Sequence, residues 1–398
     1  MPDDAAIQVT AAADAIELDG GVVKRPARLA DGRELIYFDD PGTQLSAERR
    51  IDARDLDPRP GTATMRRDIL TGEWITIAAN RQNRAMLPPA ELDPLAPQSE
   101  TNPSEVPALY DVAVFENRSP SLGPALARAT GDVPAGDDAP QGLADLQAPG
   151  LGRTRTAIGR CEVVCFSPER TGSFGTQSVT RARTVIEAWA DRTAALSALP
   201  GVQQVFPFEN RGEQIGVTLH HPHGQIYSYP YVTPRTQSLL RQIEREGADL
   251  FARIIDFELA GPRVVLESEH WVAYVPFAAR WPVEIHLVPR RHAADFTELT
   301  SAERDELARV YLRVLRGVDA LYDTPTPYIA AWHQAPVAVG RDSVRMHLQL
   351  TSPRRAADKL KFLAGSEAAM GAWTAEIPPE TGAARLREAI ANVGEVTA

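Results

Sequence analysis

The chain has 398 residues, 43% of them apolar, so it can bury a large core in two or three domain-sized units. A formal net charge of −11 argues against a nucleic-acid scaffold, because such proteins usually carry a basic surplus. No apolar run approaches the ~20 residues of a membrane span, the acidic first residues lack a signal-peptide pattern, and two cysteines are too few for a disulfide framework. We therefore expect a cytoplasmic protein without a membrane or nucleic-acid partner.

The first part of the chain predicts short strands joined by polar loops. Residues 1–30 are acidic and alanine-rich and predict a mobile segment, whereas "GRELIYFDD" (32–40) predicts a short first strand. "MRRDILTGEWITIAANRQNR" (65–84) predicts two strands around a Thr-Gly turn, followed by a polar loop with arginines. An alternating strand follows over residues 110–115. Residues 124–153 are rich in Gly, Pro, Ala and Asp without periodicity, which indicates a loop or a partly disordered insertion.

The next part of the chain predicts one unit used twice. Each copy has a strand, a helix with one apolar face, and two further strands. The strands of the first copy are "CEVVCFSPER", "VQQVFPFEN" and "HPHGQIYSY", and those of the second are "VEIHLVPRRH", "YIAAWHQA" and "RMHLQL". Under this alignment His347 matches His223, and Gln349 matches Gln225. Any two segments of this composition can be aligned, so a chance likeness stays open.

These elements predict an α+β fold in which the antiparallel strands of both copies join in one curved sheet, with helices packed on one side. We divide the chain into an N-terminal extension with a short strand (1–60), a first unit that includes the insertion (61–235), and a second unit that begins with a connecting helix (236–398). Apolar positions over 239–255 predict that connecting helix, and "GAARLREAIANV" predicts a closing one.

The stretch "HPHGQI" (221–226) places two imidazoles and an amide at alternate positions. Side chains along a strand alternate between faces, so His221, His223 and Gln225 are expected on one face at intervals of about 7 Å. Pro222 lacks a backbone N–H, which fits a position at a sheet edge. Histidines at this spacing also occur in metal sites and as satisfied polar groups, and both alternatives stay open.

The residue types in this stretch favour phosphoryl or nucleotidyl transfer. A histidine is mostly unprotonated at neutral pH, so His223 can attack with one ring nitrogen while the other donates to a backbone carbonyl such as that of His221. Gln225 is neutral at every pH and can donate to a non-bridging phosphoryl oxygen without transferring a proton. Positioning and charge stabilisation do most of the work in such transfers.

The stretch "FENRGEQIGVTLHHPHGQI" (208–226) resembles the active-site segment of galactose-1-phosphate uridylyltransferases, which belong to the histidine-triad superfamily and carry the unit twice. The resemblance extends through "DVAVFENRSPSL", "WPVEIHLVPRRH", "AAWHQAP" and "KLKFLAGSE". It implies that His223 attacks the α-phosphorus of UDP-glucose, expels glucose 1-phosphate, and holds UMP until galactose 1-phosphate takes it. It also implies a homodimer.

The resemblance further implies roles for individual residues. His223, Gln225 and His221 match the catalytic segment. The matches to substrate-binding residues are Arg81, Arg84, Asn117, Asn210, Thr218, Lys361, Phe362 and Glu367. Arginines of the family lie near the phosphates, which suits a guanidinium fork. The last three matches belong to a segment that reaches the hexose from the partner subunit.

Departures from the family's pattern lead us to expect no tightly bound metal and no other cofactor. Members often hold a structural zinc through Cys-x-x-Cys, a later histidine and the first histidine of His-Pro-His. Here "DPLA" (93–96) stands at the Cys-x-x-Cys position and Arg170 at the later histidine, so only His221 remains, and one ligand does not hold zinc.

A second iron or zinc site of some members uses a glutamate and three histidines. His333 and His347 match two of these ligands, but Leu239 stands at the glutamate and Gln349 at the last histidine. A residual metal near His333 and His347 stays open.

Three classes of function stay open. Gln225 favours the transferase, because histidine-triad hydrolases usually carry a third histidine there. A phosphorylase of ADP-glucose or of a dinucleoside polyphosphate would share the intermediate on His223 but accept inorganic phosphate. The third class is a non-catalytic nucleotide-binding protein. Ser366 and Trp373 stand where the family commonly has a tyrosine and a glutamine, so the hexose acceptor stays open.

Overall fold

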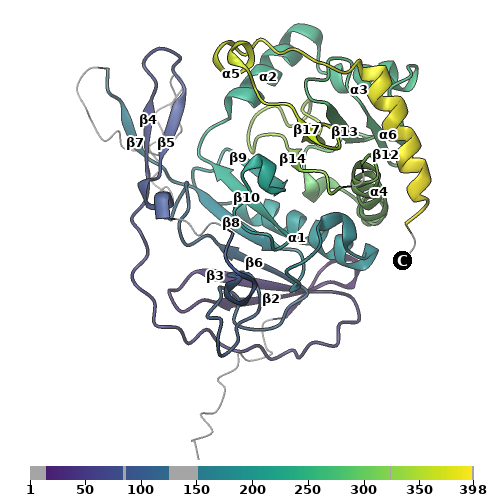
Figure 1. Cartoon of the computed structure of the whole chain (residues 1–398). Coiled ribbons are helices and arrows are strands. Elements are labelled where there is room, and N and C mark those ends of the chain that lie inside the picture. Colours follow the sequence, from purple (N-terminus) through teal and green to yellow (C-terminus); the bar gives the residue numbers. More distant parts are fainter. Residues whose placement is uncertain (1–14, 84–86, 125–150, 323, 397–398) are drawn as a thin grey trace, which may run out of the picture.

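A computed structural model of the chain describes residues 15–83, 87–124, 151–322 and 324–396. Its largest element is a twelve-stranded sheet (Figure 1). The strands of this sheet are β1 (Ile16–Glu17), β2 (Val23–Arg28), β3 (Glu34–Asp39), β6 (Val112–Glu116), β8 (Arg160–Cys165), β9 (Gln204–Arg211), β10 (His223–Tyr229), β11 (Val264–Glu267), β12 (Trp271–Tyr274), β13 (Val283–Pro289), β14 (Tyr328–His333) and β15 (His347–Ser352). Their spatial order is β1-β2-β3-β6-β8-β10-β9-β14-β15-β13-β12-β11, and neighbouring strands are antiparallel.

The sheet contains the same unit twice, as the repeat in the sequence predicts. The first unit is β8, α1 (Val179–Ser197), β9 and β10, and the second is β13, α4 (Ser301–Asp319), β14 and β15. The order β8-β10-β9 is followed by β14-β15-β13, so the units meet where β9 pairs with β14. The predicted single antiparallel sheet is confirmed, and β10 and β15 hold equivalent places on the two sides of its centre.

The main helices lie on one face of the sheet. α1, α4 and the closing helix α6 (Pro379–Val393) pack side by side there (Figure 1). Helix α1 begins where the Ser178 side chain accepts a hydrogen bond from the backbone N–H of Arg181. Helix α4 begins with a capping box between Thr300 and Glu303. These caps satisfy backbone N–H groups that an uncapped helix leaves without a partner.

An aromatic cluster fills the space between these helices and the sheet. Trp189 from α1, Tyr311 from α4 and Trp332 from β14 lie in it with Phe174 and Phe296, and neighbouring ring centroids are 4.9 to 6.3 Å apart. Each large apolar side chain buried in this way contributes roughly 1.5–3 kcal/mol. Because the cluster draws on both units, it holds them together as one body.

Two expectations about local structure are wrong. The strand within 32–40 is the third, because β1 and β2 precede it, and β2 pairs with β3 from Val23↔Asp39 to Arg28↔Glu34. The described part of residues 1–30 therefore belongs to the large sheet. β2 reads "VKRPAR", and its lysine, arginines and proline suit a strand near a sheet edge but hide the apolar alternation that sequence reasoning uses. Residues 1–14 lie outside the described part of the chain.

The connecting helix is in fact two helices, α2 (Pro234–Glu246) and α3 (Leu250–Leu259). The chain turns at Gly247, whose φ of +109° disfavours any residue with a Cβ. On α3, Ile255 packs against Val272 and Tyr274 of β12. That face of the sheet is opposite to the one under α4, because Trp271 and Ala273 of the same strand belong to the main core.

The predicted hairpin of residues 65–84 is confirmed but stands apart from the large sheet. Its strands β4 (Thr64–Arg67) and β5 (Trp74–Ile77) form a small sheet with β7 (Thr154–Thr156), at the upper left of Figure 1. Most of the 124–153 segment lies outside the described residues. Near the C-terminus a short hairpin of β16 (Arg354–Ala356) and β17 (Lys359–Leu360) precedes α5 (Gly365–Met370). In the described residues, no helix combines the length and apolar character of a membrane span.

Candidate active site

Strand β10 carries His223 as its first residue, in the middle of the large sheet. It pairs with β8 from His223↔Cys165 onward, but its pairing with β9 begins only at Gln225↔Phe208. The expected sheet-edge position of Pro222 is therefore wrong. Pro222 comes directly before the first residue of a central strand, so its missing N–H removes no hydrogen bond from the sheet. Its carbonyl accepts a hydrogen bond from the backbone N–H of Phe166 at 3.1 Å.

The imidazole of His223 is held in one orientation. Its Nδ1 lies 2.7 Å from the carbonyl oxygen of His221, the hydrogen bond that the sequence predicts. A carbonyl oxygen can only accept, so Nδ1 carries the proton and the neutral ring keeps its lone pair on Nε2. The half-buried ring lines a cleft, and its nucleophilic nitrogen is Nε2.

His221 does not share the face of His223 and Gln225, contrary to expectation. It precedes the strand, is only 2% exposed, and does not line the cleft. Its Nδ1 lies 2.8 Å from Oδ2 of Asp93, and its Nε2 lies 2.7 Å from the carbonyl oxygen of Ser167. The ring is therefore held between a carboxylate on one side and a backbone carbonyl on the other, and Nδ1 donates to Asp93.

Asp93 stays ionised in this buried place. Burial alone would raise the pKa of its carboxyl group, but the hydrogen bond and the charge of His221 outweigh burial and lower the pKa. The hydroxyl of Tyr110 also lies 3.1 Å from Nε2 of His221. The resulting cluster fixes the backbone at His221, and therefore the carbonyl that orients His223.

Between His223 and Gln225 only glycine fits. A Cβ on Gly224 would lie 2.8 Å from the ring of Phe166 and 3.0 Å from the carbonyl oxygen of Phe208. Gln225 lines the cleft beside His223, as predicted, and its Oε1 is buried without a hydrogen-bond partner among the described residues. The side chain carries an NH2 group that can donate to a phosphoryl oxygen bound in the cleft.

The cleft has a volume of about 170 Å³ and also contains two of the predicted substrate-binding residues, Asn117 and Thr218. Its remaining lining residues are Arg33, Pro94, Leu95, Glu105, Phe115, Arg118, Val163 and Leu219. Leu95, Phe115 and Val163 give it apolar walls, which suit the flat face of a base. The structure thus brings a nucleophile, an amide donor and an apolar slot together in one cleft.

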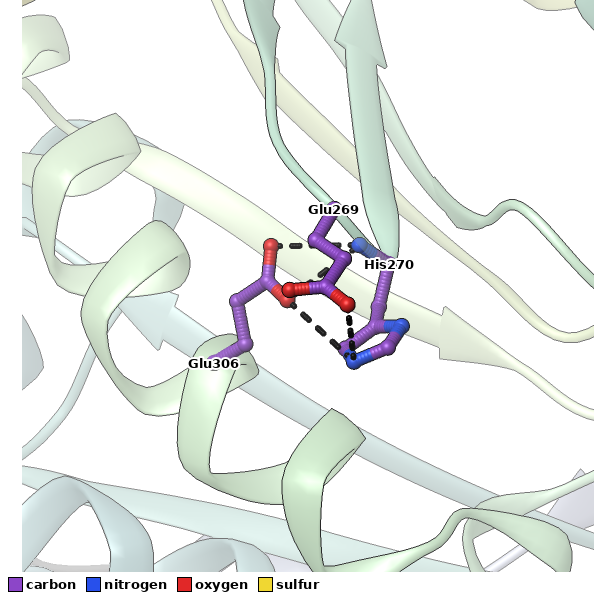
Figure 2. Close-up of side chains that lie close together, drawn as sticks. All are labelled: Glu269, His270 and Glu306. Atoms are coloured by element: carbon purple, nitrogen blue, oxygen red, sulfur yellow. Dashed lines mark hydrogen bonds and ion pairs between the residues drawn. The ribbon is translucent and has the colours of Figure 1, made fainter.

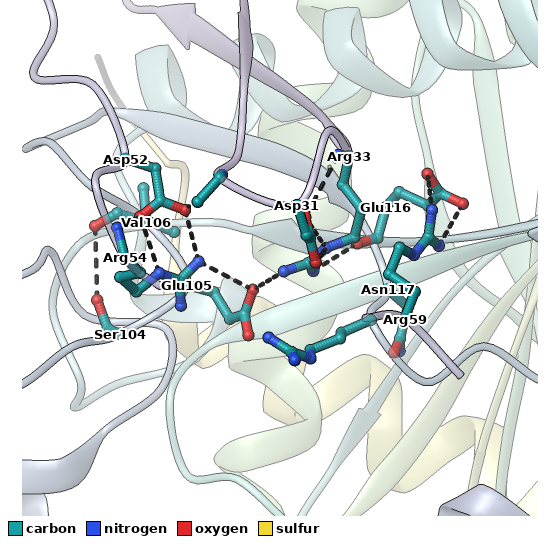
Figure 3. A network of polar contacts seen from close by, with 12 residues as sticks. Asp31, Arg33, Asp52, Arg54, Arg59, Ser104, Glu105, Val106, Glu116 and Asn117 are labelled. Atoms are coloured by element: carbon teal, nitrogen blue, oxygen red, sulfur yellow. Dashed lines mark hydrogen bonds and ion pairs between the residues drawn. The ribbon is translucent and has the colours of Figure 1, made fainter. Parts of the chain in front are cut away.

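A network of ion pairs (Figure 3) borders the cleft, because its members Arg33 and Glu105 line it. Arg33 binds Asp31 and Glu105, and Arg54 binds Asp52. Sequence reasoning missed Arg33 and Glu105 as cleft residues. Arg33 lies in the N-terminal extension, and neither residue stands in a recognisable motif, so only the fold reveals them.

Two other predicted residues of the first unit, Arg81 and Asn210, do not line the cleft. Nη1 of Arg81 lies 3.4 Å from the hydroxyl of Tyr227, a residue that shares the strand face of His223 and Gln225. Asn210 lies on β9, two residues after Phe208, which pairs with Gln225. Continuing this register places Asn210 opposite His223. Arg84 lies outside the described residues.

Lys361, Phe362 and Glu367 do not meet His223 within one chain. Lys361 and Phe362 line a different cavity, beside Trp281 and Ile329. Lys361 is buried and forms an ion pair with Glu367 at 2.7 Å, whereas Phe362 is 75% exposed.

The residues at the family's zinc position do not form a zinc site. Asp93 and His221 bind each other, and Arg170 donates to the carbonyl oxygen of Pro88 at 2.8 Å. A zinc ion would need the nitrogen of His221 that faces Asp93, and further ligands that Ala96 and Arg170 cannot supply. The ion pair of Asp93 and His221 stands in place of the metal.

The residues at the second metal position do not fit a metal either. His333 and His347 stack with ring centroids 5.0 Å apart, but Leu239 offers no donor atom. Nε2 of Gln349 donates to Glu284 at 2.7 Å. Arg235 faces the same cavity as the two histidines, and its charge opposes a cation.

One other group of the described residues brings three metal-ligating side chains together, Glu269, His270 and Glu306 (Figure 2). Both oxygens of Glu306 already accept the backbone N–H of His270 at 3.2 Å, and the Glu269 side chain is 84% exposed. These contacts describe an ion-pair cluster at the start of β12, on elements that do not touch the cleft of His223.

An oriented imidazole beside an amide donor, on a duplicated α+β sheet, defines a site for covalent group transfer. Comparisons with known proteins agree. The N-terminal domain of galactose-1-phosphate uridyl transferases matches residues 55–233, and their C-terminal domain matches residues 236–396. The chain belongs to this family.

The relatives extend over most of the chain. The galactose-1-phosphate uridylyltransferase of Streptomyces lividans is 42% identical, over 94% of this chain and 99% of that protein. The enzyme of Rattus norvegicus is 33% identical, over 85% of this chain and 93% of that protein. A solved uridylyltransferase structure has a TM-score of 0.70 at 28% identity, over 83% of this chain and 99% of that chain. A solved ADP-glucose phosphorylase from Arabidopsis thaliana shares the fold, with a TM-score of 0.59 at 21% identity.

Proposed function

We propose that this chain transfers a uridylyl group from UDP-glucose to galactose 1-phosphate in two half-reactions. In the first, Nε2 of His223 attacks the α-phosphorus. The bond to the bridging oxygen breaks, and glucose 1-phosphate leaves with the electron pair. In the second, a phosphate oxygen of galactose 1-phosphate attacks the same phosphorus, UDP-galactose leaves, and the imidazole is restored. Family membership supports this reaction, and the hydrogen bond from Nδ1 of His223 to His221 is the observation that carries it.

The surrounding residues divide the work. The NH2 end of Gln225 donates to a non-bridging oxygen as charge develops there. Asn117 and Thr218 position the nucleotide in the cleft, while Asn210 and the arginines at 81 and 84 hold the phosphates. The leaving groups are phosphates, so neither half-reaction needs a general acid. His221 acts through its carbonyl oxygen and does not touch substrate.

A product assay tests this reaction. The protein is incubated with UDP-glucose and galactose 1-phosphate, and separately with ADP-glucose and inorganic phosphate. We expect UDP-galactose in the first tube and no ADP in the second. Release of ADP and glucose 1-phosphate in the second tube, without product in the first, would assign a phosphorylase. A protein without turnover in either tube that binds UDP-glucose unchanged would be a nucleotide-binding protein only.

We also propose that the reaction requires no metal or other cofactor. The support is the buried pair of Asp93 and His221 where the family holds zinc. Treatment with EDTA should leave the rate and the melting temperature unchanged. Loss of activity after chelation that zinc restores would contradict this proposal.

A homodimer would give Lys361, Phe362 and Glu367 a place at the active site, because within one chain they lie away from the cleft and Phe362 is largely exposed. Mixed dimers test this arrangement. A His223→Ala chain and a Phe362→Ala chain, refolded together, should regain activity, since one of the two sites then has both residues intact. No recovery in a mixture that contains mixed dimers would contradict it. The two buried, unpaired cysteines suit the reducing cytoplasm that we expect for this enzyme.

A further inference from the structure

The second unit has a cavity of its own, at the place equivalent to the cleft of His223. It has a volume of about 380 Å³ and is lined by residues of α2, including Arg235 and Gln242, by Arg280 from the loop before β13, and by His333 and His347. It is larger than the cleft of His223, so it can admit a small organic molecule. The proposed reaction makes no use of it.

Two guanidinium groups face this cavity without a direct counter-charge. Among the described residues neither Arg235 nor Arg280 forms an ion pair, and the two lie close enough to repel each other. Glu284 is the carboxylate that acts on Arg235, but it is buried and bound elsewhere. Its oxygens accept hydrogen bonds from the Gln349 amide at 2.7 Å and from the backbone N–H of Arg280 at 2.6 Å.

Two further features favour a negatively charged ligand with hydroxyl groups. The cavity opens at the first turn of α2, where the helix dipole is positive. Nδ1 of His347 faces the carbonyl oxygen of Arg345 at 3.0 Å, so Nε2 is the acceptor of its neutral ring. Such a nitrogen can take the O–H of a hydrogen phosphate or of a sugar.

We propose that this cavity is a second binding site, for a phosphate group or its monoester with a small polyol. Arg235 and Arg280 hold the phosphate oxygens through their guanidinium forks, and His347 accepts a hydroxyl. A metal cation does not suit this cavity, because two arginines would repel it. Leu239, at the position of the family's glutamate ligand, offers no ligand atom. This site is separate from the cleft of His223 and does not depend on the proposed transfer reaction.

Binding is measured on the full chain by isothermal titration calorimetry with inorganic phosphate and, separately, with glucose 1-phosphate. The wild type is compared with Arg235→Gln and with the double variant Arg235→Gln/Arg280→Gln. Arg245→Gln is the matched control, because it removes the same charge from an exposed site on the same helix away from the cavity. Circular dichroism and melting temperature confirm that each variant is folded. The cleft of His223 is intact in all of them, so differences report the second site.

We expect two binding events in the wild type and in Arg245→Gln. One of them should weaken roughly 10- to 100-fold in Arg235→Gln and vanish in the double variant, as the loss of charged hydrogen bonds implies. If only inorganic phosphate shows the second event, the ligand is free phosphate, and if glucose 1-phosphate binds more tightly, it is a monoester. Equal binding by the wild type and the double variant would overturn the proposal. So would one equivalent of zinc or iron in the purified chain that is lost on changing His347 to alanine.

Discussion

The two units carry equivalent strands, β10 and β15, and each of these strands begins with a histidine. The surroundings of the two histidines differ. In the first, Nδ1 of His223 faces the carbonyl oxygen of residue 221, and in the second Nδ1 of His347 faces that of residue 345, at 2.7 and 3.0 Å. Both imidazoles line a cavity, but in the second unit burial, and then the charge of His286, lower the pKa of His347 to about 3. The backbone therefore prepares both imidazoles in the same way, and their neighbours decide what each one can do.

The neighbours differ most at the glutamine two residues further on. Gln225 pairs with Val163 on β8 and lines the cleft, whereas Gln349 pairs with His286 on β13 and donates to the buried Glu284. Glu284 is a fixed anion. Burial alone would raise its pKa, but the imidazole of His286 at 3.5 Å and the hydrogen bond from the backbone N–H of Arg280 outweigh burial and lower the pKa to about 2. One unit keeps its amide available for substrate, and the other uses it for structure.

The largest expected effect comes from comparing the alanine variants of the two histidines, His223→Ala and His347→Ala. His223→Ala should lower turnover by at least roughly 10⁴-fold, because it removes the nucleophile, and should abolish the UMP adduct in an intact-mass measurement with UDP-glucose. Its melting temperature should stay close to that of the wild type. His347→Ala should still form the adduct. If both variants lose the UMP adduct equally, His223 is not distinguished from His347 as the nucleophile.

The glutamines give the next largest contrast. Gln225→Ala should slow the transfer by roughly 10²- to 10³-fold, by analogy with the loss of one oxyanion donor, with little change in stability. Gln349→Ala should do the reverse. It leaves a carboxylate oxygen of Glu284 without its donor, so we expect a loss of about 1–3 kcal/mol in the free energy of unfolding at an almost unchanged rate. Rate constants and urea unfolding curves of both variants decide between these roles.

Asp93 has no counterpart at the second histidine, since residue 345 is an arginine whose Nη1 donates to backbone carbonyls. Asp93→Ala should leave the Nδ1–H of the buried His221 without its acceptor and cost about 1–3 kcal/mol of stability. It should also lower kcat, because the carbonyl that orients His223 moves. Asp93→Asn keeps an acceptor oxygen and should show both effects more weakly.

The pH dependence of this variant has a definite sign. The pKa of Asp93 is lowered in the folded chain, so its contribution is present above the carboxyl's ordinary pKa of about 3.9 and is lost as the pH falls through the folded value. The stability difference between wild type and Asp93→Ala should therefore be full at pH 7 and shrink below about pH 4. A difference that stays constant down to pH 2.5 would show that packing, and not charge, is what the variant loses.

Sequence reasoning reached the repeated unit, the single sheet and the hydrogen bond of His223 because each follows from local periodicity or from one long motif. It placed His221 on the wrong face, because it extended the strand two residues too far, and strand ends depend on partners such as β9 that the local pattern does not contain. It noted Asp93 as a departure from a zinc ligand. A carboxylate at that position, opposite a remaining histidine, is itself a signal of an ion pair.

Other parts of the cleft had no local signal. Arg33 lies in the N-terminal extension, directly before β3. It reaches the cleft only because β3 pairs with β2 in the large sheet, and the charged residues and the proline of β2 hide that strand from sequence reasoning. The broken helix at Gly247 was missed for a related reason, since the apolar positions on both sides of the glycine keep a helical spacing.

The smallest effect concerns the core beneath the two strands. Glu209 on β9 is equivalent to Trp332 on β14, because the neighbouring pairs Phe208↔Gln225 and Ala331↔Gln349 correspond. One unit thus buries an indole and the other a carboxyl group. Burial raises the pKa of Glu209 to about 8, against the opposing charge of Arg211, and its Oε1 accepts the hydroxyl of Tyr328 at 3.1 Å. The group is therefore neutral in the folded chain at pH 7.

Replacing Glu209 tests whether its buried carboxyl group is neutral in the folded chain. The folded pKa is raised, so the contribution of the protonated form is full below the ordinary value of about 4.3 and is lost as the pH rises through about 8. Glu209→Gln cannot ionise, so its stability relative to the wild type should increase by roughly 4 kcal/mol between pH 5 and pH 9 in urea unfolding. The Glu306→Gln change on α4, at a partly buried carboxylate outside the core, should not reproduce that slope. A flat difference across this range would mean that Glu209 is ionised and paired in the core, and that the two units differ there less than their side chains suggest.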